Sequence, residues 1–194
     1  MTQAKVKRSS TAVRWRDVVD PERPADAPCV LSTEIRWIVP GVWQQELQGL
    51  LPRDRPETLV DTYVVVPGMR AMSLKRRSPE PQLVVKRPVG AGRTVDVGGR
   101  TIGEGQCWEK APARADLEGD EVVVHKTRWR RGVLEVVELE AAGQVAWSVA
   151  VTVRGHHVGR LLRACDSVLA PLLEAAPLEP RTSTSYGDWV AALV

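Results

Sequence analysis

Residues that hold metals or form disulfides are scarce in this chain of 194 residues, which has three cysteines and three histidines. Cys29, Cys107 and Cys165 are odd in number and widely spaced, and no Cys-x-x-Cys pair occurs, so neither a zinc site nor a disulfide framework is indicated. The three histidines lack the helical spacing of a metal-binding pair: His125, His156 and His157.

Long hydrophobic runs are missing as well. No stretch of 18 consecutive apolar residues occurs, so the sequence predicts no transmembrane helix. Residues Met1–Ser10 are basic and polar, and no apolar core follows them, which is unlike a secretory signal. With so few cysteines, these absences favour a reducing, cytoplasmic location.

The signatures of several function classes are absent too. A net charge of +3 is too small to indicate a nucleic-acid-binding protein by itself. The glycine-rich pieces Gly90-Ala-Gly92 and Gly98-Gly-Arg100 are not followed by Lys-Ser/Thr in a helical context, which argues against a phosphate-binding P-loop. Ser167 and His156 do not form a recognisable triad sequence.

The length suits one domain with a tail. Residues 1–27 show little periodicity and are rich in Ser, Pro, Asp and Arg, so we expect a flexible N-terminal tail, with docking through Trp15 as the alternative. Residues 28–194 form the predicted domain. Residues 88–105 are rich in Gly and Val and predict a mobile connection.

Seven stretches have the composition or alternation of strands: 30–39, 58–66, 71–77, 82–87, 121–130, 133–140 and 146–154. Apolar residues repeat at helical spacing over 157–175, where Pro171 should kink or shorten the helix. Residues 42–51 are weakly helical, and 189–193 predict a short helix. This order favours an α+β fold, in which about eight antiparallel strands form a closed or nearly closed barrel with helices packed outside.

Basic residues recur at alternate positions of these strands and would share one face of each. The set is Arg36, Lys75, Arg77, Lys86, Arg87, Lys126, Arg128 and Arg130. The opposite faces, with Ile35, Trp37 and Trp129, are apolar enough to be buried. The cations therefore face either water, as on many antiparallel sheets, or the lumen of a barrel. A basic lumen would attract a small, highly charged anion.

Carboxylates accompany these cations. If Arg131-Gly132 is a hairpin turn, Arg130 lies opposite Val133, and Arg128 lies opposite Glu135, which would share the cationic face. A slip or bulge would bring Glu138 and Glu140 there instead. Carboxylates among cations suit a Mg²⁺-dependent phosphate site, and they suit a surface ladder of ion pairs equally well.

At these residues the chain resembles the CYTH superfamily, the triphosphate tunnel fold, whose hallmark is Glu-x-Glu-x-Lys on the first strand. Ser32-Thr-Glu34-Ile-Arg36 occupies that hallmark here. More closely, the chain resembles an uncharacterised bacterial CYTH-like branch. The matching stretches, in order, are Glu34–Trp37, Asp61–Tyr63 to Pro67-Gly68, Leu74–Arg77, Trp108–Lys110, Lys126–Trp129, Val137–Leu139, Trp147–Ala150, Ser185-Tyr186 and Trp189-Val190.

The resemblance implies an eight-stranded tunnel whose cations hold a triphosphate and whose carboxylates hold Mg²⁺ or Mn²⁺. The residues that it implies for phosphate binding are Arg36, Lys75, Arg77, Lys86, Lys126 and Arg128. Glu34 and Glu138 would be both the metal ligands and the catalytic carboxylates. Three positions depart from the pattern: Ser32 replaces a Glu, the last strand reads Ser148-Val-Ala150-Val-Thr152 in place of Glu-x-Glu, and Val84 stands where a Glu is expected.

Three functions follow as expectations. The first is metal-dependent hydrolysis of a triphosphate-type substrate, with weak metal dependence and slow turnover because carboxylates are missing. The second is a binding module for a phosphorylated small anion, which is favoured because the cations survive better than the acids. The third is an interaction protein that contacts nucleic acid through Arg128-Trp-Arg-Arg131. Strands of a barrel explain that spacing equally well.

Overall fold

The computed structural model describes residues 14–22, 30–41, 55–67, 69, 72–79, 82–114, 116–175 and 178–194. Its nine strands are Val30–Pro40 (β1), Glu57–Val65 (β2), Ser73–Arg77 (β3), Val84–Pro88 (β4), Arg93–Val97 (β5), Arg100–Pro112 (β6), Asp120–Arg131 (β7), Leu134–Ala141 (β8) and Gln144–Arg154 (β9). All pairings are antiparallel, in the order β1-β9-β8-β7-β2-β3-β4-β6-β5.

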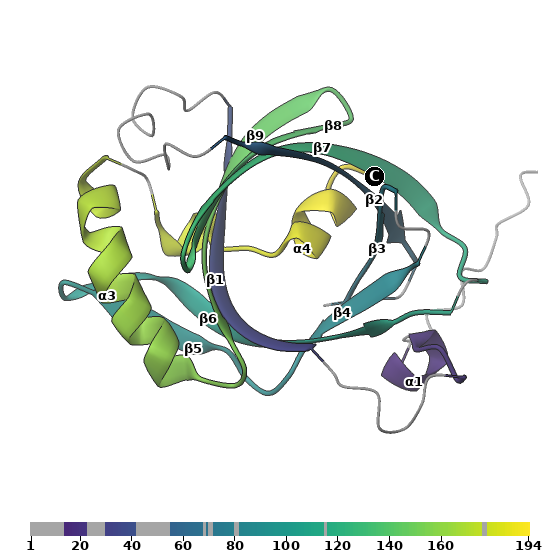
Figure 1. Ribbon diagram of the computed structural model, residues 1–194, viewed down its shortest axis with the longest axis horizontal. Helices are drawn as coiled ribbons and strands as arrows, with labels where there is room; N and C mark the ends of the chain where they lie inside the picture. The colour runs from purple at the N-terminus through teal and green to yellow at the C-terminus, as the bar shows by residue number, and fades with distance from the viewer. Residues whose placement is uncertain are drawn as a thin grey trace, which may run out of the picture.

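The sheet closes on itself. Residues 30–34 of β1 pair with residues 106–110 of β6, so eight strands form a ring and β5 extends it as an extra strand on β6. Figure 1 looks into this ring, with β1 and β2 on different sides of it. The predicted α+β class and the closed antiparallel barrel are confirmed.

The outer face of the barrel is covered by α3 (Val158–Ala175), which packs beside β5, β9 and β1. Leu161, Cys165 and Leu169 on this helix are fully buried, in one cluster with Ile35 and Trp37 from β1. Of the two effects expected of Pro171, shortening of the helix is wrong, since the helical backbone continues to Ala175, and a kink stays a prediction. The loss of one backbone donor is offset here by the buried apolar stripe.

Residues 93–112 form a hairpin rather than the expected mobile connection. Val95 and Val97 alternate into the cluster beneath α3, together with Ile102 from β6. The turn between β5 and β6 uses Gly98 and Gly99, both with positive φ. Glycine content therefore marks a tight turn here, and the alternating valines mark the strand.

The β7–β8 turn also differs from the prediction. Its central residues are Gly132 and Val133, and Gly132 has a φ of +57°, which glycine adopts without strain. The pairing shifts accordingly, so that Arg130 lies opposite Glu135 and Arg128 lies opposite Val137. Glu135 still shares the face of the cations, as expected.

Part of the expected flexible tail is docked. Residues Trp15–Val18 form α1, the Val18 side chain is fully buried, and Val19 bridges to Ala113. The Arg87 guanidinium lies 4.1 Å from the Trp15 ring centroid, so docking through Trp15 is the outcome. Residues 1–13 and 23–29, and the helix expected at 42–51, lie outside the described residues.

A short helix, α4 (Tyr186–Ala191), lies across the opening of the ring in Figure 1. It contacts β2 and β3, and Val190 is buried among barrel residues that include Ile38, Tyr63 and Leu139. Its close approach requires Gly187, because a Cβ there would lie 2.8 Å from Cβ of Ser73. No helix in the described part of the chain is both long and apolar enough to cross a membrane.

Candidate functional site

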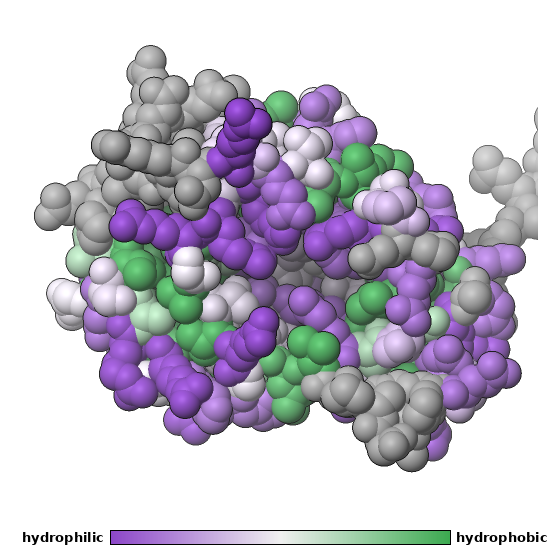
Figure 2. All heavy atoms as spheres, in the orientation of Figure 1, coloured by the Kyte–Doolittle hydropathy of each residue, from purple (hydrophilic) through white to green (hydrophobic). Residues whose placement is uncertain are grey.

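The inward faces of the strands enclose a cavity of about 420 Å³. The structure brings all six cations implied for phosphate binding to its wall, together with Lys110 and Arg130: Arg36, Lys75, Arg77, Lys86, Lys126 and Arg128. In the space-filling view, hydrophilic side chains surround a hollow at the centre of the molecule (Figure 2). Arg87 is the exception among the alternating cations, because it lies outside on Trp15 and pairs with Glu109.

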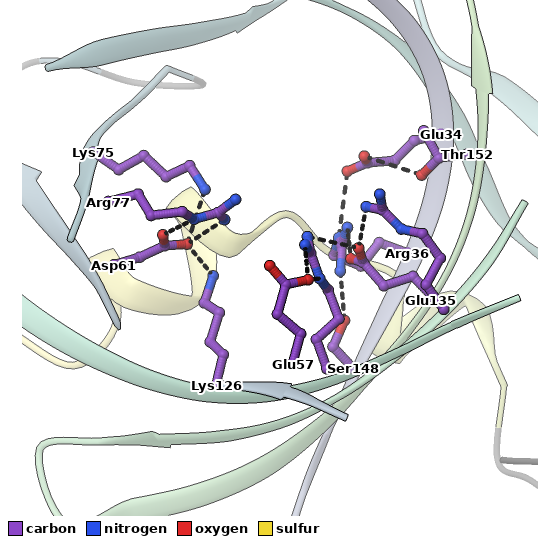
Figure 3. Close-up of polar contacts among 12 residues, drawn as sticks. Glu34, Arg36, Glu57, Asp61, Lys75, Arg77, Lys126, Glu135, Ser148 and Thr152 are labelled. Carbon is purple, nitrogen blue, oxygen red and sulfur yellow. Dashed lines mark hydrogen bonds and ion pairs between the residues drawn. The ribbon is translucent and has the colours of Figure 1, made fainter. Parts of the chain in front are cut away.

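One group of cations shares a single carboxylate, Asp61 on β2, whose side chain is fully buried (Figure 3). Its oxygens accept hydrogen bonds from Lys75 Nζ at 2.8 Å and from Arg77 Nε at 2.7 Å, and Lys126 Nζ lies 2.8 Å away. We call these four residues the Asp61 set. The sequence analysis missed Asp61, although its alternation with Leu59 and Tyr63 places it on the inward face.

A second group surrounds Glu135 on β8 and Glu34 on β1. Arg36 joins the two carboxylates, at 3.1 Å from Glu135 and 3.3 Å from Glu34, and donates to Ser148 Oγ at 2.8 Å. Lys86 lies 2.9 Å from Glu34, while Arg128 and Arg130 lie 3.5 and 2.8 Å from Glu135. We call this group the Glu135 set: Glu34, Glu135, Arg36, Lys86, Arg128 and Arg130.

Aromatic rings lie between and beside these cations. The Tyr186 ring of α4 has Lys126 Nζ 3.8 Å from its centroid and the Arg36 guanidinium 4.1 Å from it. Lys126 also donates to the Tyr63 hydroxyl at 3.0 Å, and Lys86 lies 4.3 Å from the Trp108 ring centroid. The lumen thus combines hydrogen-bond donors with cation–π contacts.

Burial and crowding of like charge alter the protonation of the lysines. Burial, followed by the charge of Lys75, lowers the pKa of Lys126 to about 7, even though Asp61 acts in the opposite direction. Burial likewise lowers the pKa of Lys86 to about 8, against the effect of Glu34. At neutral pH, Lys126 is therefore only partly protonated, whereas Lys86 is mostly protonated.

The carboxylates shift the other way. Burial alone would raise the pKa of Asp61, but the hydrogen bond from Arg77 and the charge of Lys126 hold it far below its ordinary value. The pKa of Glu135 falls to about 2, because Arg36 and Arg130 outweigh the effect of burial. The pKa of Glu34 is also well below its usual range, held there by Lys86 and Arg36. All three are therefore ionised at neutral pH.

Glu138 does not reach this site, contrary to the prediction. On β8, Glu135 and Val137 line the cavity, and Glu138 lies on the opposite face. Glu138 pairs with Trp147, which belongs to the cluster beneath α3. The step of three residues from Glu135 to Glu138 reverses the face of the strand, so Glu138 shares no cavity with Glu34. Glu135 occupies the inward position instead.

The remaining oxygen donors do not fit a protein-held Mg²⁺ or Mn²⁺ ion. Arg36 and Lys86 both donate to Oε1 of Glu34, and Thr152 Oγ1 donates to its Oε2 at 3.5 Å. Both oxygens of Glu135 accept from arginines, Oε1 from Arg36 and Oε2 from Arg130. The departing positions Ser32 and Thr152 line the cavity with hydroxyls in place of carboxylates. Within the described residues, no group of three or more His, Cys, Asp or Glu is arranged to hold a metal.

No protein-family model matches the chain, and no curated protein matches it. Among solved structures, the chain is similar to a conserved hypothetical protein from Pyrococcus furiosus, at 13% identity and a TM-score of 0.44, over 80% of this chain and 98% of that one. It is also similar to a protein from Pyrococcus horikoshii, at 9% identity and a TM-score of 0.44, over 78% of this chain and 94% of that one.

Proposed function

We propose that this protein binds a small phosphorylated anion of the triphosphate type inside the barrel. The observation that supports this best is the charge of the cavity wall: eight Lys and Arg side chains line it, against the carboxylates of Glu34, Glu135 and Asp61. Burying more positive than negative charge raises the free energy of the folded state unless an anion balances the excess. Guanidinium and ammonium groups together suit phosphate oxygens.

Binding without efficient hydrolysis is the form of this function that the donor set favours. A metal-dependent phosphohydrolase needs free hard-oxygen ligands to place Mg²⁺ on the phosphates. Glu34 and Glu135 instead neutralise Arg36 and its neighbours. We therefore propose a binding module that has kept the cations of a triphosphate tunnel without its metal ligands.

Loss of two cations of the wall should abolish binding. Triphosphate should raise the melting temperature of the unaltered chain, and the double variant Lys126→Ala/Arg128→Ala should lose that rise, because it removes one cation from each set. The control is Arg76→Ala, which lies next to Arg77 on β3 and is half exposed beside Glu121. A double variant that keeps the full rise would place the binding site elsewhere.

Turnover should be slow or absent and nearly independent of metal. Phosphate release from triphosphate, ATP and thiamine triphosphate should stay far below a typical enzymatic rate of roughly 1–10³ per second, with or without Mg²⁺ or Mn²⁺. Removing divalent ions with EDTA should leave triphosphate binding unchanged, because the chain itself supplies the cations. Metal-dependent turnover at such a rate, lost in Glu34→Gln, would contradict the binding-module proposal.

A further inference from the structure

The cations of the lumen are divided between two centres rather than spread evenly. The Asp61 set has three cations on one carboxylate. The Glu135 set has four cations on two carboxylates. No ion pair among the described residues joins one set to the other. When its lysines are protonated, as a bound anion favours, each set therefore carries two more positive than negative charges.

The carboxylates of the two centres come from different strands. Asp61 lies on β2 and Glu34 lies on β1, four places apart in the ring of eight strands, whereas β7 carries Lys126 of one set and Arg128 of the other. Figure 3 draws Asp61, Lys75, Arg77 and Lys126 on one side and Glu34, Arg36 and Glu135 on the other, with Glu57 between the two groups. The Tyr186 ring stands between the two sets, because it contacts Lys126 of one and Arg36 of the other.

The size of each surplus matches a phosphate group. A phosphate monoester carries about −1.5 to −2 charges at neutral pH, so one such group would balance either set. One phosphate group on the Asp61 set would leave the surplus of the Glu135 set unchanged. Glu57 adds a further carboxylate to Arg128, but its side chain is 55% exposed, and exposed ion pairs contribute little to stability.

We infer that the lumen holds two separate anion subsites, one on the Asp61 set and one on the Glu135 set, and that the ligand carries two anionic groups that occupy both at once. This inference rests on the proposed function and narrows its ligand to a chain of phosphates or a compound phosphorylated at two places. A ligand of this kind gains affinity from linkage, because binding of its second group is intramolecular.

Two double variants test the subsites symmetrically. Lys75→Gln/Arg77→Gln leaves Asp61 paired with Lys126 alone, and Arg128→Gln/Arg130→Gln leaves Arg36 and Lys86 with the two glutamates. Each change removes two charges and brings one set to balance, while its most buried ion pair remains. If a double variant does not fold, the single variants Arg77→Gln and Arg130→Gln replace it in the test, because both side chains are partly exposed.

Isothermal titration at constant ionic strength gives the readout, with orthophosphate and triphosphate as probes. The unaltered chain should bind two orthophosphate ions and one triphosphate, the latter at least about tenfold more tightly because its groups are linked. Each double variant should bind one orthophosphate ion and lose at least about tenfold in triphosphate affinity. The single variants should lose triphosphate affinity in the same direction, and Arg76→Gln should match the unaltered chain.

Two results would overturn the inference. One is a single orthophosphate ion bound to the unaltered chain and lost in both double variants, which would mean one shared site. The other is a folded double variant whose triphosphate affinity stays within about threefold of the unaltered chain. Failure of the proposed function looks different, since then neither probe would bind the unaltered chain, and the inference would fall with it.

Discussion

Asp61→Asn should lower the free energy of unfolding by about 3–5 kcal/mol, because breaking a buried ion pair leaves an uncompensated charge. Asp61 is fully buried and is the shared partner of Lys75, Arg77 and Lys126. The amide keeps the shape of the side chain, so the loss is one of charge rather than of packing. Urea unfolding at pH 7, followed by circular dichroism, measures the change.

The matched control is Glu121→Gln, which removes a carboxylate from the neighbouring strand. Glu121 is 53% exposed and pairs with Arg76 on the outer face, so its loss should cost about 1 kcal/mol or less. Triphosphate should also restore more stability to Asp61→Asn than it adds to the unaltered chain, because its charge substitutes for the missing carboxylate. An Asp61→Asn chain as stable as the control would show that the three cations do not depend on Asp61.

The parts of this architecture that follow from alternation could be predicted from the sequence. A strand places every second side chain on one face. Alternation alone therefore predicts that Arg36, Lys75 and Arg128 lie on the basic faces of their strands. The apolar positions between them, such as Ile35 and Trp37, identify the other face, which packs under α3. Closure into a ring then turns a basic face into a basic lumen.

What could not be predicted depends on register and on contacts distant in the chain. The resemblance implied Glu138 at the site, whereas strand alternation alone places Glu135 on the inward face. The turn lies one residue later than expected, which shifts the pairing by two residues and leaves the inward face of β8 unchanged. Tyr186 lies 150 residues after Arg36, and only the docking of α4 brings them together. A lone Asp in a strand likewise gives no local sign that three cations converge on it.

Binding of a polyanion in the cavity should be coupled to protonation of Lys126. Lys126 is almost fully buried, and the groups that face it are Asp61 and Tyr63 from β2, Lys75 from β3, Arg36 from β1 and Tyr186 from α4. Burial and the charge of Lys75 lower the pKa of Lys126 to about 7 in the empty site. A bound polyanion favours the protonated amine, so it should raise that pKa toward its ordinary value.

Triphosphate affinity should therefore fall as pH rises above about 7. Below that pH, Lys126 is already charged and binding takes up no proton. Between pH 7 and 9, Lys126 must take up a proton on binding, so its contribution should decrease the affinity by up to about tenfold per pH unit, or about a hundredfold over this range. Titration calorimetry at pH 8 in two buffers with different enthalpies of ionisation should show the uptake directly, with up to about one proton per bound triphosphate from Lys126.

Lys126→Gln separates this effect from the ionisation of triphosphate itself, which becomes more negative over the same range and acts in the opposite direction. Lys86, with its pKa of about 8, remains in the variant and should give a shallower decrease that begins about one pH unit higher. Subtracting the two profiles isolates the proton on Lys126. If the unaltered chain binds triphosphate equally well at pH 6.5 and 9, with no proton uptake, then Lys126 is not the amine that balances the bound anion.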